Sequence, residues 1–351
     1  VCDALARGDA AALHLPQLRC ATPRQRSQNT MLAITVACLT FSGSKDYAGL
    51  FAGYKKNFSK AYESPAHEAK AFAAFSAAED AITTHNSKAS SFKLGHNAHS
   101  DKVWEEFFQG GYIPRSKRNH TAAKLHQARP LSQVATSVDW VTSGAVTGVK
   151  NQGQCGSCWS FSTTGAIEGA YYIASGTLTS FSEEMLVECD TTDSGCNGGS
   201  MDNAFTWVET HGLATESSYP YTSSSGTSGT CDSTANPVVT VTGYTDVSSE
   251  DDLQSAVAQQ PVSVAIEADQ SVFQYYTSGV IDSTSCGTTL DHGVLVVGYG
   301  TDSTYGAYWK VKNSWGTTWG EEGYVRIAKG SNMCGIAMDP SYPTGAQAWS
   351  A

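Results

Sequence analysis

The sequence predicts an α+β fold with two subdomains, because helical patterns come first and strand patterns follow within one stretch of chain. From Trp159 to Ala174 nearly all residues are apolar or small, and the run ends near Gly176, which is typical of one buried helix. Glu184 to Glu188, preceded by Ser182 as a cap, and Ser200 to Thr210 predict two more helices. After Pro237, short β-branched runs predict five strands: Val238 to Val241, Val262 to Ile266, Val294 to Tyr299, Tyr308 to Lys312 and Tyr324 to Ile327.

Residues 1–44 are interpreted as an N-terminal extension that contains a secretory segment. Leu32 to Phe41 is a short apolar run between Met31 and the small residues Ser42-Gly43-Ser44, the pattern of a secretory h-region with its cleavage zone. A buried strand is the alternative interpretation of this run. Because the chain begins with Val1, we expect translation to start at Met31 and residues 1–30 to be an upstream extension.

Residues 45–135 form the second predicted part of the chain, and residues 136–351 form the third. Asp46 to Asn86 is expected to be helical, because aromatic residues recur there at three- and four-residue steps. A second aromatic group follows at Trp104, Phe107 and Phe108. From Ile113 to Arg129 the chain is basic, polar and weakly periodic, which predicts an exposed linker that is open to proteolysis.

Charge divides the chain at the same place. Of the 351 residues, 40% are hydrophobic and 16% are charged, which fits a globular chain and not a disordered one. Residues 1–135 hold 17 Lys and Arg against 10 Asp and Glu, whereas residues 136–351 hold 5 against 23. The basic front and the acidic back are expected to attract each other, with simple solubility as the alternative reason for the split. The acidic back argues against a nucleic-acid partner, and no apolar stretch is long enough for a membrane helix.

Cysteine usage indicates an oxidising compartment and one unpaired thiol. Three of the ten cysteines lie in the front part and seven in the back part. Because seven is odd, three disulfides would leave one free and potentially reactive thiol.

The strongest chemical signal is Cys158, in the run Gln152-Gly153-Gln154-Cys155-Gly156-Ser157-Cys158-Trp159. A thiol at a predicted helix start is favoured as a thiolate, but it also needs a base. Only His211 and His292 lie in the back part, and His292 precedes a Val-rich strand that would aim its ring rigidly. Asn313 can orient that imidazole, and the Gln152 amide, with the N–H of Cys158, can stabilise an oxyanion.

Each of these residues also has a plainer interpretation. Cys155 and Cys158 have the spacing of a redox or metal-binding pair, although the Gly-Ser between them lacks the usual proline. Cys155, Cys189, Cys196 and Cys231 have the number but not the spacing of a four-thiolate zinc site. His292 can also be a structural histidine. We predict catalysis at Cys158 and His292, with neither a metal nor a cofactor.

By its motifs the back part resembles the papain family of cysteine proteases, closest to the cathepsin L-like branch. The resemblance covers nearly all of Val138 to Pro343 and rests on these segments: Gln152 to Ser162, Gly195 to Gly199, Leu290 to Gly300, Asn313 to Gly323, Cys334 to Ile336 and Ser341 to Pro343. It implies a papain-like α+β fold, with a helical left subdomain, a β-barrel-like right subdomain and a cleft between them.

The resemblance also implies a role for each motif residue. Cys158 would be the nucleophile, His292 the acid and base, Asn313 the orienting residue and Gln152 the oxyanion donor, while Trp315 would shield the His–Asn contact. The implied disulfides are Cys155–Cys196, Cys189–Cys231 and Cys286–Cys334, which leave Cys158 free.

Residues 45–135 resemble the inhibitory propeptide of the same family, less closely. The helix positions at which the family carries Glu, Arg, Phe, Asn, Ile and Asn hold His67, Ala71, Phe75, Ala78, Ile82 and Asn86. The family's Gly-Asn-Phe-Asp pattern is present as Gly95, Asn97, His99 and Asp101. We expect the mature enzyme to start within a few residues of Thr136. The basic propeptide is hypothesised to clamp the acidic enzyme, and acid would then weaken the clamp by protonating carboxylates.

The resemblance places a peptide-binding site around the catalytic residues. Its members are Gly198, Gly199, Ser200, Met201, Asn203, Ala265, Leu290, Asp291, Trp315 and Asp339. The pocket for the second residue before the cut is mostly apolar or small, which favours Leu, Phe or Val. Asp339 would let it accept Arg as well, and a solvent-facing carboxylate is the alternative. The two histidines of the back part are not adjacent, so we expect an endopeptidase without a paired-histidine occluding loop.

The predicted function is that of a cysteine endopeptidase made as a zymogen, acting on proteins and peptides. A catalytically idle storage or binding relative and a thiol–disulfide oxidoreductase are the rival hypotheses. The expected location is the secretory pathway, leading to a lysosome, a vacuole or the exterior, and sequons at Asn57 and Asn119 agree with it. The enzyme is expected to be a monomer that is open to cystatin-type inhibitors and binds neither nucleic acid nor membrane.

Overall fold

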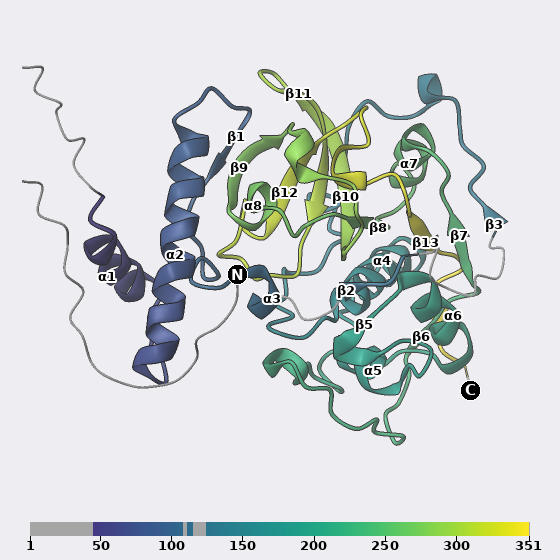
Figure 1. Ribbon diagram of the computed structural model, residues 1–351. Coiled ribbons are helices and arrows are strands. Elements are labelled where there is room, and N and C mark those ends of the chain that lie inside the picture. The colour runs from purple at the N-terminus through teal and green to yellow at the C-terminus, as the bar shows by residue number, and fades with distance from the viewer. Residues whose placement is uncertain (1–44, 108–110, 115–123, 351) are drawn as a thin grey trace, which may run out of the picture. The chain divides into compact units, whose positions relative to one another are not determined.

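The computed structural model describes residues 45–107, 111–114 and 124–350 (Figure 1). The expected secretory run at residues 32–41 and the sequon at Asn119 lie outside the described residues. The chain divides into the units Val1–Lys45 and Asp46–Ala351, and the second unit contains every element described below. None of the helices in the described ranges combines the length and the apolar character that a membrane crossing requires.

The stretch expected to be helical from Asp46 to Asn86 is two helices, α1 (Tyr47–Asn57) and α2 (Pro65–Asn86). A new helix begins at Ser64 and Pro65. The Ser64 hydroxyl accepts the N–H of His67 at 3.2 Å, and Pro65 takes the first helical position, where its missing N–H leaves no bond unmade. The periodicity on both sides was predicted correctly, but the break was not.

The two helices share an aromatic core. Phe51 and Tyr54 of α1 lie with ring centroids 5.3 Å and 5.0 Å from that of Phe75 on α2, which is 1% exposed. The Tyr54 hydroxyl donates to the Asp101 carboxylate at 3.0 Å, where Lys60 also donates at 3.0 Å. The region of α1 and α2 therefore has its own packed interior.

The three helices expected after Val138 are present, and each end differs by one residue from the prediction. They are α4 (Cys158–Ser175), α5 (Glu183–Cys189) and α6 (Met201–His211). Ser182 and Ser200 cap α5 and α6 by accepting backbone N–H groups, and Gly176 ends α4 in the left-handed conformation with φ of 75°. The other helices in the described ranges are short: α3 (Trp104–Phe107), α7 (Glu250–Val257) and α8 (Ser271–Gln274).

The strands form a mainly antiparallel sheet in the order β1-β9-β12-β11-β10-β8-β13-β7-β3, with β4 also paired to β10. Its strands are β1 (Phe92–Leu94), β3 (Lys124–Leu125), β4 (Val138–Asp139), β7 (Tyr244–Asp246), β8 (Val262–Ile266), β9 (Tyr276–Ile281), β10 (His292–Asp302), β11 (Gly306–Lys312), β12 (Tyr324–Ala328) and β13 (Ser341–Pro343). Two small pairs stand apart, β2 (Gly111–Tyr112) with β5 (Gly198–Gly199), and β6 (Val239–Thr240) with β14 (Gln347–Ala348).

The described residues before Val138 contribute three short strands, each paired with a strand from the later part of the chain. β1 pairs with β9 in the antiparallel direction, whereas β2 and β3 pair in parallel with β5 and β7. Residues 113–129 were expected to be an exposed linker, and both residues of β3 are indeed exposed, but the backbone of β3 is paired with a sheet edge, which was not expected. A two-residue strand carries no periodicity of its own, so only its partner reveals it.

Two hydrophobic cores meet along α4, which packs against β10 as well as α6 (Figure 1). One core lies around the sheet and includes Phe273, Trp309 and Trp319, and the other lies among the helices and includes Trp159, Phe205 and Leu186. The α+β class and the two-subdomain architecture are confirmed. The N-terminus of α4 and the start of β10 come together where the two cores join.

Phe75→Ala should destabilise the propeptide region by about 3–5 kcal/mol, because a buried ring is replaced by a cavity while Ala keeps the helix. The measurement is urea unfolding of the full chain carrying Cys158→Ala, which removes the reactive thiol. Leu50→Ala on α1 is the control, since Leu50 is 44% exposed and its truncation should cost less than about 1 kcal/mol. Equal losses in the two variants would contradict the described aromatic core.

Candidate active site

Cys158 is the first residue of α4 and its side chain is fully buried. Its sulfur accepts the backbone N–H of Gly293 at 3.3 Å. Because Gly293 follows His292 directly, this bond brings the thiol to the strand that carries the histidine. The helix N-terminus places partial positive charge beside the sulfur, which favours its thiolate form.

His292 is held between an amide and aromatic rings. Its Nε2 donates to Oδ1 of Asn313 at 2.8 Å, and the same oxygen accepts the N–H of Ser314 at 2.8 Å. An oxygen that accepts twice fixes the orientation of the Asn313 amide, so in the neutral ring the proton sits on Nε2. The Trp315 ring covers the imidazole at a centroid distance of 4.9 Å and is 2% exposed. Nδ1 is therefore the nitrogen able to accept a proton from the thiol.

Burial favours the neutral form of both groups. Burial raises the pKa of Cys158 to about 12, although the N–H of Gly293 favours the thiolate. Burial lowers the pKa of His292 to about 4, although the bond to Asn313 favours the charged ring. Burial also raises the pKa of the neighbouring Asp291 to about 7. Each shift opposes a charge that water would otherwise stabilise.

Gln152 is held by hydrogen bonds in the loop that precedes α4. Its Nε2 donates to the carbonyl of Cys155 at 2.8 Å, and its Oε1 accepts the Ser314 hydroxyl at 2.6 Å. Its backbone N–H donates to the Ser314 carbonyl at 2.9 Å. The amide is therefore tied both to the loop before Cys158 and to the residue that follows Asn313.

Gly198 and Gly199 present a backbone edge to a peptide segment. β2 pairs with them, and the N–H of Ile113 donates to the carbonyl of Gly199 at 2.8 Å. Gly198 has φ of 111°, and a Cβ there would lie 2.4 Å from the carbonyl oxygen of Gly111. Only glycine allows a second backbone to approach this closely.

The expected subsite pocket is occupied by Tyr112 of the propeptide region. Tyr112 packs in one apolar cluster with Met201, Ala265 and the partly buried Leu290. Its hydroxyl donates to Oδ2 of Asp339, which is only 3% exposed. Asp339 is therefore not a solvent-facing carboxylate in this structure.

Two other expected site residues lie beside this pocket. Ser200 is buried and caps α6. The Asn203 amide is turned toward Asp193, to which it donates at 3.0 Å.

The cysteines pair as the family resemblance implies. The structure contains the disulfides Cys155–Cys196, Cys189–Cys231 and Cys286–Cys334, and Cys158 is the free cysteine of the described ranges. Cys155 is thus bonded away from Cys158, which leaves no Cys-x-x-Cys pair for redox or zinc chemistry.

Comparison with known proteins assigns two regions of the chain. The model described as "Papain family cysteine protease" matches residues 134–344, and the model described as "Cathepsin propeptide inhibitor domain (I29)" matches residues 51–107. The chain belongs to the papain family of cysteine proteases. This papain-family chain is a cysteine endopeptidase made as a zymogen, and its propeptide is an intramolecular inhibitor.

Relatives and solved structures agree over most of the chain. The papain-family chain is 40% identical over 329 residues to the senescence-specific cysteine protease SAG39 of Oryza sativa subsp. indica, covering 89% of this chain and 96% of the relative. It is 44% identical over 317 residues to cathepsin L of Sarcophaga peregrina, covering 83% and 91%. Digestive procathepsin L 3 of Tenebrio molitor larval midgut superposes with a TM-score of 0.74 at 37% identity, covering 86% of this chain and all of that one. The recombinant stem bromelain precursor gives 0.76 at 35%, covering 86% and 99%.

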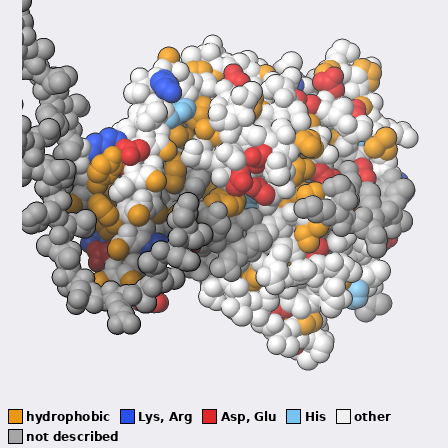
Figure 2. All heavy atoms as spheres, viewed as in Figure 1, with side chains coloured by type: hydrophobic (Ala, Val, Ile, Leu, Met, Phe, Trp, Pro, Cys, Tyr) orange, Lys and Arg blue, Asp and Glu red, His pale blue; other side chains and the backbone are white. Residues whose placement is uncertain are grey.

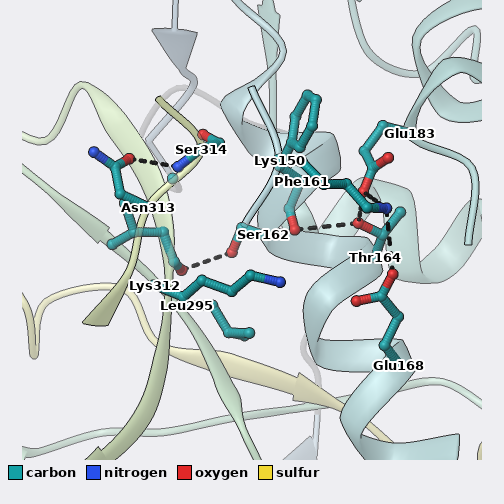
Figure 3. A pocket seen from close by; sticks show the side chains of 12 residues that line it. Lys150, Phe161, Ser162, Thr164, Glu168, Glu183, Leu295, Lys312, Asn313 and Ser314 are labelled. Carbon is teal, nitrogen blue, oxygen red and sulfur yellow. Dashed lines mark hydrogen bonds and ion pairs between the residues drawn. The ribbon is translucent and has the colours of Figure 1, made fainter. Parts of the chain in front are cut away.

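A buried ionic cluster behind the catalytic centre was missed by sequence reasoning. In Figure 3 the Lys150 ammonium lies between the carboxylates of Glu183 and Glu168, at 2.6 Å and 3.4 Å. Lys312 donates to the Thr147 hydroxyl at 3.0 Å, and that hydroxyl donates to Glu168 at 2.6 Å. A cavity of about 20 Å³, room for one water, lies among these side chains.

This cluster connects the segments that carry the predicted catalytic residues. Lys150 lies two residues before Gln152, Lys312 immediately precedes Asn313, and Glu168 lies on α4 with Cys158. Burial opposes ionisation of Glu168, but the charges of Lys150 and Lys312 outweigh it and hold its pKa below the ordinary value. The one sequence signal was Glu168 itself, a carboxylate inside an otherwise apolar or small helix run.

Glu168→Gln should destabilise the protein by about 3–5 kcal/mol, because it removes a fully buried carboxylate whose charge compensates both Lys150 and the buried Lys312. The measurement is urea unfolding of the Cys158→Ala zymogen. Glu216→Gln is the matched control, since its carboxylate is 3.9 Å from Lys150 and 27% exposed, and its loss should cost less than about 1 kcal/mol. A Glu168→Gln protein as stable as the control would show that the cluster does not depend on this charge.

Proposed function

We propose that Cys158 and His292 form the catalytic pair, with Asn313 and Gln152 in supporting roles. The observation that carries the proposal is one buried centre in which the thiol, the imidazole and the Asn313 amide are linked through Gly293 and Nε2. The thiol proton passes to Nδ1 of His292, and the thiolate attacks the scissile carbonyl carbon. The oxyanion is stabilised by the Gln152 amide and the N–H of Cys158.

Collapse of that oxyanion breaks the peptide C–N bond. His292 gives its proton to the leaving amine, and a thioester between Cys158 and the acyl part remains. Water, deprotonated by His292, then attacks the thioester carbonyl, releases the acid and returns the thiol. Asn313 keeps the proton on Nε2 throughout, so Nδ1 faces the reaction.

We expect Cys158 and His292 to become a thiolate and an imidazolium when the propeptide is removed. The pKa shifts of Cys158 and His292 both arise first from burial, and departure of the covering segment lets water reach them. The positive end of α4 then favours the thiolate and the neighbouring imidazolium. Inhibition would thus have two parts: the propeptide blocks the cleft, and it keeps Cys158 and His292 in their uncharged forms.

Substrates are proposed to bind as the propeptide does, by strand pairing with Gly198 and Gly199. Their second residue before the cut would take the place of Tyr112, among Met201, Ala265 and Leu290. These neighbours favour an apolar or aromatic side chain. Asp339 at the end of the pocket would also pair with an arginine.

The remaining proposals concern processing and location. We propose maturation within a few residues of Thr136, and delivery through the secretory pathway to a lysosome, a vacuole or the exterior. The three disulfides support an oxidising compartment. A monomer that is open to cystatin-type inhibitors remains an expectation from the family resemblance.

An epoxide-type cysteine-protease inhibitor should label the mature enzyme once, on Cys158, and abolish its activity. Cys158→Ser should take no label. The zymogen should react at least about 10-fold more slowly at neutral pH, because its thiol is covered and protonated. Mass spectrometry of the labelled peptide is the measurement. A stoichiometric label on another residue, or an active Cys158→Ser enzyme, would refute the proposed nucleophile.

Asp339→Asn should lower kcat/KM for an Arg-Arg reporter peptide by about 10- to 100-fold. The reason is that the substrate arginine would then face an uncharged amide in place of a carboxylate. A Leu-Arg reporter should change by less than about 3-fold, and it serves as the internal control for folding. The comparison uses mature wild-type and variant enzymes under identical conditions. An equal loss on both reporters would mean that Asp339 supports the pocket without selecting a basic residue.

A further inference from the structure

Two aspartates lie in the loop that carries the Gly198–Gly199 edge. This loop, residues 190–200, joins α5 to α6, and β5 forms its last part (Figure 1). Asp190 is only 4% exposed, and Asp193 is partly buried. Neither residue belongs to the proposed catalytic centre, so their burial needs a separate explanation.

The Asp193 carboxyl group lies directly against the edge. A Cβ at Gly199 would be 2.8 Å from the carboxyl carbon of Asp193. Oδ1 of Asp193 accepts the backbone N–H of Ser200 at 3.0 Å and the side-chain amide of Asn203 at 3.0 Å. Any movement of this carboxyl group would therefore be passed to the residue that follows the edge.

Both carboxyl groups use one oxygen and leave the other without a donor. Oδ1 of Asp190 accepts the N–H and the hydroxyl of Thr192 at 2.9 Å and 2.5 Å. The Oδ2 atoms of Asp190 and Asp193 are both buried and accept no hydrogen bond from any other group of the described residues. The two carboxyl groups are, however, in hydrogen-bonding contact with each other.

Two carboxylates in contact cannot both be ionised cheaply, because like charges repel and burial removes the water that would screen them. Among the described residues neither carboxylate has a basic partner. One proton held between them turns the repulsion into a hydrogen bond and satisfies both Oδ2 atoms. Burial, and then the charge of Asp190, raise the pKa of Asp193 to about 8, so this proton is retained at neutral pH.

We propose that Asp190 and Asp193 share one proton, and that the resulting carboxyl–carboxylate hydrogen bond positions the Gly198–Gly199 edge for pairing with a substrate backbone. Loss of the proton in alkali would then loosen the edge. The edge already pairs with one backbone, since the N–H of Ile113 donates to the carbonyl of Gly199 at 2.8 Å. The proposal rests on the proposed function, in which a substrate takes the place of β2 at this edge.

The other charged side chains of the neighbouring helices are directed to partners elsewhere. Glu188 of α5 accepts the Tyr219 hydroxyl, and Asp202 of α6 accepts the Ser341 hydroxyl at 2.6 Å. From α4 the loop receives the uncharged Trp159 ring, which donates to the carbonyl of Gly195 at 3.2 Å. The titration that acts on the edge is therefore that of the aspartate pair itself.

The pH dependence of unfolding tests the shared proton. Two free aspartates have released their protons by about pH 5, whereas the folded pair keeps one until the pH approaches 8. The stability that this proton contributes is thus present in acid and is lost as the pH rises. In urea unfolding of the Cys158→Ala zymogen, the unfolding constant with the native pair, divided by that with Asp193→Asn, should rise by about 10-fold per pH unit from pH 5 to pH 7.

Asp193→Asn is the informative variant because its amide reproduces the protonated pair at every pH. The amide oxygen accepts from Ser200 and Asn203, and the amide N–H donates to Asp190. Asp232→Asn is the matched control, since it removes an exposed carboxylate and should leave the pH dependence of the native pair unchanged.

Kinetics of the mature enzyme test the positioning. At pH 9 the KM of wild type for a Leu-Arg reporter should exceed that of Asp193→Asn by about 5- to 20-fold, with kcat within about 3-fold. Backbone pairing holds the ground state and the transition state alike, so its loss appears in KM. The ratio of the two enzymes cancels the titration of His292, which both contain. Asp193→Ala leaves Asp190 unpaired and should show the raised KM already at pH 6.

Two results would overturn the proposal. Equal pH dependence of unfolding in the native pair and in Asp193→Asn would exclude the shared proton. A wild-type KM in Asp193→Ala would show that the pair does not position the edge. If that variant does not fold, Asp190→Asn replaces it, because its amide also donates across the pair and should abolish both pH effects. Absence of reporter cleavage by mature wild type would refute the proposed function, whereas unfolding of the zymogen decides the shared proton independently.

Discussion

The bond from the Gly293 N–H to the Cys158 sulfur joins the two halves of this enzyme. The thiol lies at the start of α4 and the histidine lies at the start of β10, so the proposed chemistry depends on how these two elements meet. A Cβ at position 293 would lie 3.4 Å from the Cys158 backbone and 3.2 Å from the Met201 sulfur. Glycine there lets the strand approach the helix closely, and the Ser162 hydroxyl, which donates to the Val294 carbonyl at 2.7 Å, holds the two together one turn further along.

The propeptide uses backbone pairing at three separate edges, and this explains how it tolerates an unusual sequence. Strand pairing depends on N–H and carbonyl groups that every residue but proline supplies. The family positions on α2 nonetheless keep their structural place, because Ala71, Phe75, Ala78 and Ile82 are all buried. Asn86 donates to the Leu94 carbonyl at 2.7 Å and accepts the Leu94 N–H at 3.1 Å, so it connects α2 to β1. Ala71 and Ala78 cannot make the hydrogen bonds of the family's Arg and Asn side chains, but they keep the helix.

Sequence predicted the elements whose pattern is local and missed those that a partner dictates. The α4 run, the cap at Ser182 and the Val-rich strand after His292 are all determined within a dozen residues. The break at Ser64 and Pro65 was missed although its signal is local, since a serine followed by proline is typical of a helix start. The β3 strand, the Tyr112 contact with Asp339 and the Lys150 cluster were not readable. Each joins residues far apart in the chain, and nothing in either segment alone requires the other.

The basic side chains of the enzyme are paired within the enzyme, which limits what the opposite net charges of the two parts can explain. All five Lys and Arg residues of positions 136–351 have an internal partner: Lys150 with Glu183, Lys310 with Asp139, Lys312 with Thr147, Arg326 with Glu321, and Lys329 over the Trp309 ring. Lys55, Lys60 and Lys70 likewise pair with propeptide carboxylates, Glu68, Asp101 and Glu106. On the face shown in Figure 2 the visible Lys and Arg side chains gather mainly at the α1–α2 end, and Asp and Glu are scattered over the enzyme.

Specific ion pairs are therefore not what holds the described propeptide helices to the enzyme. The contacts that do so are a hydrogen bond and an aromatic contact. The Asn97 amide donates to the Gln274 carbonyl at 2.7 Å, and Trp104 packs edge-to-face on Trp315 with ring centroids 6.1 Å apart. An opposite net charge on the two parts adds a diffuse attraction that salt screens over about 10 Å, whereas these buried contacts are screened far less. Attraction of the acidic enzyme for its basic propeptide thus assists association, while backbone pairing and apolar packing determine where the propeptide binds.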